Sequence, residues 1–221
     1  MWIMGVDMGT SGCKAVVFDE NWSIVCQAYR EYPMFFPGEG LLELDAERVW
    51  QEIRNVIREA NEKAAQPVQA LAVSAIGDVI IPVDAQGNSV RRSIVDFDAR
   101  GGEEIAEFAE TFGRQRFFDL CGMPPLYIGS LAKMLWLRKH EPEVWEKAAR
   151  WSTYEDFIVC KLGLPATASY SEAARTMLFD LRKKTWAKDI LDAISITEQM
   201  LPAVKPSGTP VGQLPPKMAR E

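Results

Sequence analysis

Histidine and cysteine are scarce in this sequence, which has one histidine, four cysteines and no C-x-x-C pair. Because these residues supply most structural zinc sites, their scarcity argues against a zinc centre, and a chain of 221 residues does not need a disulfide scaffold. No run approaches the ~18 apolar residues of a membrane span. No basic and then apolar leader opens the chain either. We therefore expect a cytoplasmic protein that does not enter a membrane.

An excess of positive charge is also missing. The sequence has 25 Lys and Arg against 31 Asp and Glu, which gives a net charge of −6. The absence of a basic patch argues against nucleic acid as a partner, and no G-x-x-x-x-G-K-[ST] phosphate loop is present. With 48% hydrophobic and 25% charged residues, the composition is that of a globular protein with a buried core.

The opening segment is the most informative part of what is present. Two apolar strands, over 2–7 and 13–19, flank a turn of small residues. Glycine lets such a turn place backbone N–H groups around an anion. The pattern predicts a site for the phosphates of ATP, with Asp7 holding Mg²⁺ through water; the alternative is an ordinary hairpin turn with a solvated lysine. The predicted contacts are Asp7, Gly9, Thr10, Ser11, Gly12 and Lys14.

The remaining sequence mixes helical and extended patterns. Asp45 is placed as the N-cap of a helix over 46–65. Further helices are predicted over 102–112, 114–121, 130–140 with Ser130 as its cap, 142–149, 153–162 and 186–193. Strands are predicted over 23–32, 69–75, 79–83 paired with 90–95, and 166–170 paired with 176–181.

These elements predict an α/β fold with a mixed sheet that begins with an antiparallel β-hairpin and is flanked by helices. Since the first turn leads into a second strand and not into a helix, the pattern argues against a dinucleotide-binding fold.

Taken in order, several motifs resemble the amino-terminal domain of the FGGY carbohydrate kinases, the family of xylulokinase, gluconokinase and glycerol kinase. The motifs are Asp7-x-Gly9-Thr10-Ser11-x-x-Lys14, Glu43-x-Asp45-Ala46-x-x-x-Trp50, Gly77-Asp78, Asp96-Phe97-Asp98-Ala99-Arg100 and the segment 171–180. Three places depart from the family pattern: Ala46 replaces a proline, Asp96 replaces a tryptophan, and Gly77-Asp78 aligns where many members carry Met-His-Gly or Arg-Glu. The resemblance implies the actin-like, ribonuclease H-like ATPase fold over 1–221.

The resemblance also implies an activity, namely ATP- and Mg²⁺-dependent phosphorylation of a hydroxyl of a ketose, polyol or related sugar, with a pentulose favoured. The residues expected to contact the substrate are Asp78, Asp96, Asp98 and Arg100. For Asp98 and Arg100 the alternative is an ion pair that only fixes the turn, and for Asp78 it is a helix cap or a surface turn. The 96–100 turn also resembles the branch of the family that phosphorylates autoinducer-2.

Family members carry a second domain that supplies the adenine pocket, a second phosphate motif and the catalytic aspartate. None of these is found in this sequence, so no catalytic residue is assigned, and we expect the chain not to turn over alone. The expected partners are a small sugar or polyol and the missing carboxy-terminal domain, with a homodimer left open. The competing readings are a non-catalytic sugar- or partner-binding module and another ATPase of the actin-like fold.

Overall fold

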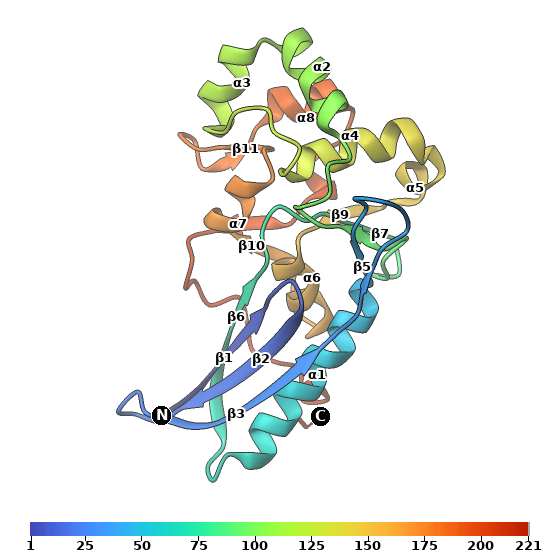
Figure 1. Ribbon diagram of the computed structural model, residues 1–221. Coiled ribbons are helices and arrows are strands. Elements are labelled where there is room, and N and C mark those ends of the chain that lie inside the picture. The colour runs from blue at the N-terminus through green and yellow to red at the C-terminus, as the bar shows by residue number, and fades with distance from the viewer. Residues whose placement is uncertain (221) are drawn as a thin grey trace.

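A four-stranded mixed sheet forms the lower part of the molecule in the computed structural model, which describes residues 1–220 (Figure 1). Its strands lie in the order β3-β2-β1-β6. β1 pairs antiparallel with β2, β2 antiparallel with β3, and β1 parallel with β6. The strands are β1 (Trp2–Met8), β2 (Gly12–Phe18), β3 (Ile24–Glu31) and β6 (Val68–Ala75). The predicted hairpin start and mixed sheet are therefore confirmed.

One face of this sheet is covered by α1 (Ala46–Lys63) and α6 (Tyr154–Lys161). Asp45 caps α1 as predicted, since its carboxylate accepts hydrogen bonds from the backbone N–H groups of Glu47 and Arg48, both at 3.1 Å. Apolar residues of α1 recur at helical spacing and pack on the inward side chains of β1 and β2. This first core includes Met4, Val6, Ala15, Val17, Val49, Ile53, Val56 and Phe157.

A second hydrophobic core lies in the upper, helical part of the molecule (Figure 1). Its helices are α2 (Gly102–Phe112), α3 (Arg114–Cys121), α4 (Ser130–His140), α5 (Pro142–Lys147) and α8 (Lys188–Ile194). They enclose Ile105, Phe117, Leu131, Met134, Trp151, Leu178 and Ile190. The predicted bounds of α2, α3 and α4 match the structure. No helix within residues 1–220 is both long and apolar enough to cross a membrane.

The other elements are short. They are β4 (Met34–Phe35), β5 (Glu43–Leu44), β7 (Ile81–Val83), β8 (Ser93–Ile94), β9 (Arg150–Ser152), β10 (Thr167–Ser169), α7 (Tyr170–Arg175), β11 (Phe179–Asp180), β12 (Thr185–Trp186), β13 (Ala203–Lys205) and the 3₁₀ turns Glu198–Met200 and Met218–Arg220.

One predicted strand pairing is present only as isolated antiparallel bridges, and the other is wrong. β7 pairs with β9 and β8 with β5, and only two isolated bridges join 79–83 to the segment after it. In place of a pairing between 166–170 and 176–181, β10 pairs with β13 and β11 with β12. The segment between β10 and β11 is helical because the Ser169 hydroxyl caps α7, accepting a hydrogen bond from the Glu172 N–H at 3.2 Å.

Two helix starts also differ from the prediction. Ser130 is the first residue of α4 and not its cap: Gly129 holds the cap position, the Ala132 N–H donates to the Gly129 carbonyl at 3.1 Å, and the buried Ser130 hydroxyl has no hydrogen-bond partner within residues 1–220. α8 begins at Lys188, two residues later than predicted, since Trp186 belongs to β12 and its indole N–H donates to the Pro202 carbonyl at 2.8 Å.

Candidate functional site

The two main candidate segments, the 9–12 turn and the Gly77–Asp78 turn, meet at the carboxyl ends of strands β1 and β6. β1 and β6 run parallel, with Asp7 beside Ser74, and the Ile76 N–H donates to the Met8 carbonyl at 2.9 Å just past the strand ends. The 9–12 turn and the Gly77–Asp78 turn follow these two strands directly. The carboxyl ends of parallel strands are where open α/β sheets bind ligands, so the fold brings the predicted phosphate and sugar residues together.

The 9–12 turn is held in one shape by its neighbours. The Gly9 N–H donates to the Gly12 carbonyl at 2.9 Å. The buried Tyr32 hydroxyl donates to the same carbonyl at 3.1 Å and also to the Gly9 carbonyl. A Cβ at Gly12 would lie 2.6 Å from the Arg30 carbonyl oxygen, so only glycine fits there. Tyr32 was not identified from the sequence, because nothing near position 32 marks it as a support for a turn so far away.

The tip of this turn has free hydrogen-bond donors. Within residues 1–220, the backbone N–H groups of Thr10 and Ser11 donate to no protein acceptor, whereas that of Gly9 is used inside the turn. Asp7 and Lys14 are exposed and lie opposite each other across β1 and β2. Two free N–H groups beside an exposed lysine form a suitable site for an anion. The nucleotide contacts predicted at these positions stay predictions.

The predicted Mg²⁺ site is compatible with these residues. No three His, Cys, Asp or Glu side chains lie close enough within the described part of the chain to form a protein-ligated metal site. Mg²⁺ does not require one, since it commonly keeps several waters and binds one or two carboxylates together with substrate phosphates. The exposed carboxylate of Asp7 at the rim of the turn suits that role, which stays a prediction.

Asp78 lies three residues after the end of β6, in a strained conformation. Its φ is +65°, a value that side chains other than glycine rarely adopt. The residue is 5% exposed, and its Oδ2 accepts from Arg175 Nε at 3.0 Å and from Arg175 Nη2. Its other oxygen, Oδ1, is buried without a partner. Burial raises the pKa of Asp78, although the contact with Arg175 opposes this effect. A buried acceptor without a partner is suited to a ligand hydroxyl.

Asp96 and Lys133 complete this group of charges. Asp96 also has a buried oxygen, Oδ1, with no partner in the chain. Lys133 is fully buried in α4, and its Nζ donates to the Arg100 carbonyl at 3.2 Å and to that of Asp98. Burial lowers the pKa of Lys133 to about 8, while the charges of Asp98, Asp96 and Asp78 favour its protonated form. The arrangement can hold a molecule that presents several hydroxyls to carboxylates.

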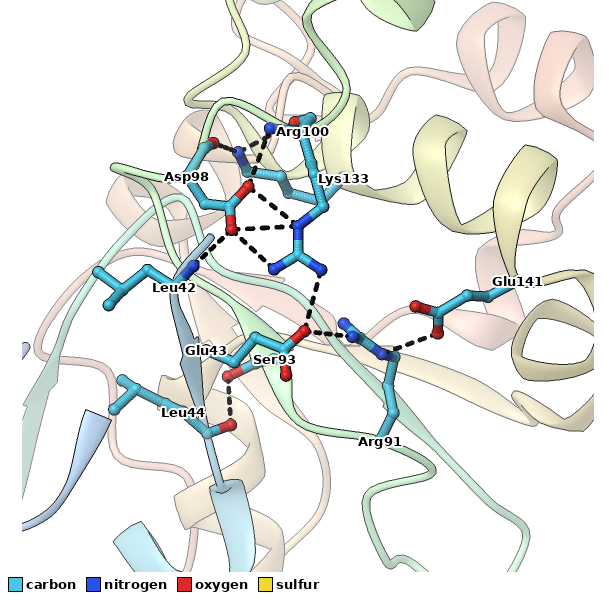
Figure 2. Close-up of polar contacts among 9 residues, drawn as sticks. All are labelled: Leu42, Glu43, Leu44, Arg91, Ser93, Asp98, Arg100, Lys133 and Glu141. Atoms are coloured by element: carbon cyan, nitrogen blue, oxygen red, sulfur yellow. Dashed lines mark hydrogen bonds and ion pairs between the residues drawn. The ribbon is translucent and has the colours of Figure 1, made fainter. Parts of the chain in front are cut away.

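Asp98 and Arg100 form a buried ion network (Figure 2). Asp98 is 0% exposed, and its carboxylate accepts from the Leu42 N–H at 2.7 Å and from Arg100 Nη2 at 2.7 Å. Arg100 also contacts Glu43 at 2.9 Å, which in turn pairs with Arg91 at 2.5 Å. The predicted substrate role of Asp98 and Arg100 stays untested. Their contacts favour the alternative, an ion pair that fixes the turn.

Three residues near this site were missed in the sequence. Glu172 and Arg175 lie in the segment 171–180, which was noted only as a family motif, and Lys133 lies in the helix predicted over 130–140. Glu172 is 7% exposed, its Oε1 has no partner, and burial raises its pKa to about 9, with Glu155, Asp156 and Asp78 adding to the effect. A single lysine within the apolar stretch of α4 was the one signal available for Lys133.

Comparison with known proteins agrees with this geometry. The model of the "FGGY family of carbohydrate kinases, N-terminal domain" matches residues 2–221. The glycerol kinase of Saccharolobus islandicus strain M.14.25 is 29% identical over 214 residues, which cover 93% of this chain and 42% of the relative. The glycerol kinase of Thermococcus gammatolerans is 28% identical over 218 residues, covering 96% of this chain and 44% of the relative. The chain therefore spans less than half the length of these relatives.

Solved structures share the fold. The xylulose kinase of Rhodospirillum rubrum superposes with a TM-score of 0.93 at 23% identity, over 100% of this chain and 46% of that one. The gluconate kinase of Lactobacillus acidophilus gives a TM-score of 0.92 at 22% identity, over 99% of this chain and 44% of that one. This similarity confirms the predicted fold class.

Proposed function

Because this chain belongs to the FGGY family of carbohydrate kinases, we propose that it supplies the phosphate turn and most of the sugar pocket of an ATP- and Mg²⁺-dependent kinase. The acceptor is a hydroxyl of a ketose, polyol or related sugar, with a pentulose favoured. The observation that carries the proposal is that the free N–H groups of the 9–12 turn and the unpartnered Oδ1 of Asp78 follow the carboxyl ends of the parallel strands β1 and β6, with the carboxylate of Asp96 close enough to Asp78 to raise its pKa.

In this proposal, different residues bind the nucleotide and the sugar. The N–H groups of Thr10 and Ser11 hold a phosphate, while Lys14 adds positive charge, and Asp7 binds the waters of Mg²⁺. Bound Mg²⁺ neutralises charge on the phosphates during transfer. Asp78 and Asp96 accept hydrogen bonds from sugar hydroxyls, and Arg175 fixes the orientation of Asp78. Together these contacts orient the reacting groups, which is the main contribution a protein makes to phosphoryl transfer.

The proposal includes a carboxy-terminal domain, since the chain spans 42% of the length of the Saccharolobus glycerol kinase. A sugar hydroxyl needs a positioned base to take its proton as attack begins. In our proposal this base and the adenine pocket belong to the second domain, residues 1–221 form one amino-terminal domain, and the enzyme works in the cytoplasm.

The test is an ADP-release assay with ATP and Mg²⁺ on the longer product of the same reading frame and, separately, on residues 1–221. Xylulose, gluconate and glycerol are the acceptors, chosen because related proteins are named for them. We expect the longer protein to release ADP with at least one acceptor and the 221-residue chain to release none. ADP formation by the short chain would contradict the assignment of the base and the adenine pocket to the second domain. An inactive longer protein would contradict the proposed function.

Asp78→Asn is expected to weaken sugar use by the longer protein. The amide keeps the shape but presents one oxygen instead of two, so the KM for the acceptor should rise about tenfold, or ~1.4 kcal/mol. The KM for ATP should stay the same. Asp119→Asn, on the exposed side of α3, makes the same chemical change away from the edge and serves as the control. An unchanged acceptor KM would remove Asp78 from the sugar pocket.

A further inference from the structure

We propose that Lys133 is a positioning residue of the acceptor site, the pair of carboxylates formed by Asp78 and Asp96. Its buried ammonium fixes the backbone of the 96–100 turn and supplies positive charge that keeps Asp78 ionised. Lys133 acts through the two aspartates and does not bind the sugar itself. The inference rests on the proposed function in taking these aspartates as acceptor contacts, and it goes beyond it by assigning a role to a residue of α4.

Lys133 is joined to the 96–100 turn through the main chain of that turn. The side chain is fully buried, and Nζ donates to the backbone carbonyl of Arg100 at 3.2 Å and to that of Asp98 (Figure 2). The end of the turn also lies against the backbone of α4, since a Cβ at Gly101 would come within 2.2 Å of the Ala132 carbonyl oxygen. The ammonium therefore helps to fix the backbone of the turn relative to α4.

The charge of Lys133 is not taken up by a direct ion pair. In this cluster Asp98 pairs with Arg100 at 2.7 Å, and Asp78 pairs with Arg175. Both hydrogen bonds that the Lys133 ammonium donates within residues 1–220 go to carbonyls and not to a carboxylate. Burying an ammonium without a paired carboxylate is unfavourable. A residue retained in that position points to a role in the site and not only in the fold.

The two aspartates of the acceptor site are close enough to feel this charge. Asp78 and Asp96 each have a buried carboxylate oxygen without a partner in the described part of the chain. Burial raises the pKa of Asp78, whereas Arg175 lowers it, Asp96 raises it and Lys133 lowers it. An ionised carboxylate accepts a stronger hydrogen bond than a neutral carboxyl group. Lys133 therefore favours the form of Asp78 that accepts a sugar hydroxyl.

Several charged or titratable groups lie around Asp78. They are Arg175 and Glu172 of α7, Asp96 of the 96–100 turn and Lys133 of α4. An arginine keeps its charge at every pH of interest. Burial raises the pKa of Glu172 to about 9, so this group stays neutral as the pH falls from 8 to 5. The carboxyl groups of Asp78 and Asp96 are then the ones to follow in this range.

The first measurement follows the Asp78 carboxyl group directly, by carbon NMR of the longer protein labelled at its aspartate carboxyl groups, from pH 3 to 8.5. The Asp78→Asn variant assigns the signal. Lys133→Met is close in size to the parent residue and has no charge. In this variant the titration midpoint of Asp78 should rise by at least about one pH unit, because a nearby positive charge has been removed.

Two further variants complete this measurement. Lys133→Gln also removes the charge but keeps an N–H donor, and it should shift the midpoint of Asp78 in the same direction. Lys147→Met makes the same chemical change as Lys133→Met on the exposed side of α5, and it should leave the midpoint unchanged. An unchanged midpoint in both Lys133 variants would overturn the proposal.

The second measurement is the acceptor KM from pH 5 to 8.5, with whichever of xylulose, gluconate and glycerol the longer protein phosphorylates. A shift of one unit in the midpoint of Asp78 corresponds to a tenfold difference at acid pH. The acceptor KM of Lys133→Met should be about tenfold above the parent value toward pH 5 and within about twofold of it at pH 8.5. There the parent also loses this charge, since burial lowers the pKa of Lys133 to about 8. At each pH, kcat and the KM for ATP should match the parent within about twofold.

Two other results would overturn the proposal. A KM that rises equally at every pH would mean that Lys133 only supports the fold. A shifted midpoint of Asp78 with an unchanged acceptor KM would mean that its charge does not affect acceptor binding. The NMR measurement needs no activity, so the two proposals can fail separately. A longer protein that is inactive with all three acceptors but shows the shift contradicts the proposed function alone, and an active one without the shift contradicts the role of Lys133 alone.

Discussion

Replacing Asp98 with alanine is expected to lower the free energy of unfolding by about 3–5 kcal/mol, the usual cost of removing one partner of a buried ion pair. Asp98 is fully buried, and its carboxylate accepts hydrogen bonds from Arg100 and from the Leu42 N–H. Nearby, the Lys133 ammonium is also buried. Alanine would leave these cations without the nearest negative charge. Urea denaturation of the variant and the parent measures the loss.

A matched aspartate provides the control. Asp84 also accepts two backbone hydrogen bonds, from Gln86 and Asn88, but it does so on an exposed turn. Asp84→Ala should therefore destabilise the protein much less than Asp98→Ala does, because solvent replaces the hydrogen bonds of an exposed carboxylate. If Asp98→Ala proved as mild as this control, the network would not hold the 96–100 turn, and a direct role for Asp98 at the substrate would gain support.

Asp98 also makes the stability of the protein depend on pH. Burial alone would raise the pKa of Asp98, but hydrogen bonds from Arg100 and Leu42 outweigh it and hold the pKa below its ordinary value. The contribution of Asp98 to stability is thus complete above about pH 4, the unfolded pKa of an aspartate, and is lost as the pH falls through the lower, folded pKa.

The sequence predicted the long elements well because their signals are local. The apolar spacing of α1 lies within that helix, and its cap at Asp45 lies directly before it. The opening hairpin could also be predicted, since a turn of small residues between two apolar segments indicates where both strands begin and end. These elements form the two cores.

The short strands could not be predicted in the same way. β7, β8, β10 and β11 have two or three residues each, and each is defined by a partner that is distant in the sequence. β10 pairs with β13, more than 30 residues later, and the intervening helix α7 was not predicted. No local pattern carries that information, because pairing at this range depends on how the two cores pack.

The residues of the candidate site could be predicted from the sequence only in part. Asp7, Asp78 and Asp96 could be proposed from the sequence because Asp7 lies near the end of β1 and the other two lie in turns after strands, where side chains reach ligands. Lys133 was missed because a lysine on a helix normally points to solvent, whereas here six consecutive residues of α4, from Ser130 to Leu135, are buried. Asp98 was identified, but its saturated hydrogen bonds become evident only once Leu42 lies beside it.

Replacing Glu172 with glutamine is expected to stabilise the protein by about 3 kcal/mol at pH 7 and by almost nothing at pH 4. Burial, strengthened by the charges of Glu155, Asp156 and Asp78, raises the pKa of Glu172 to about 9. Above about pH 4.5 the unfolded chain releases this proton and the folded chain keeps it. The free energy of unfolding then falls by about 1.4 kcal/mol per pH unit until the folded group ionises. Glutamine has no proton to release, so its variant escapes this loss.

Urea denaturation at pH 4, 5.5, 7 and 8.5 measures the difference between variant and parent. The variant should still lose some stability between pH 4 and 6, since burial also raises the pKa of Asp156, to about 6. Glu146→Gln, on the exposed side of α5, should follow the parent at every pH. A difference that stays constant from pH 4 to 8.5 would mean that Glu172 is ionised in the folded protein. Its charge would then have to be balanced by Arg175, and Arg175 could no longer be assigned to Asp78 alone.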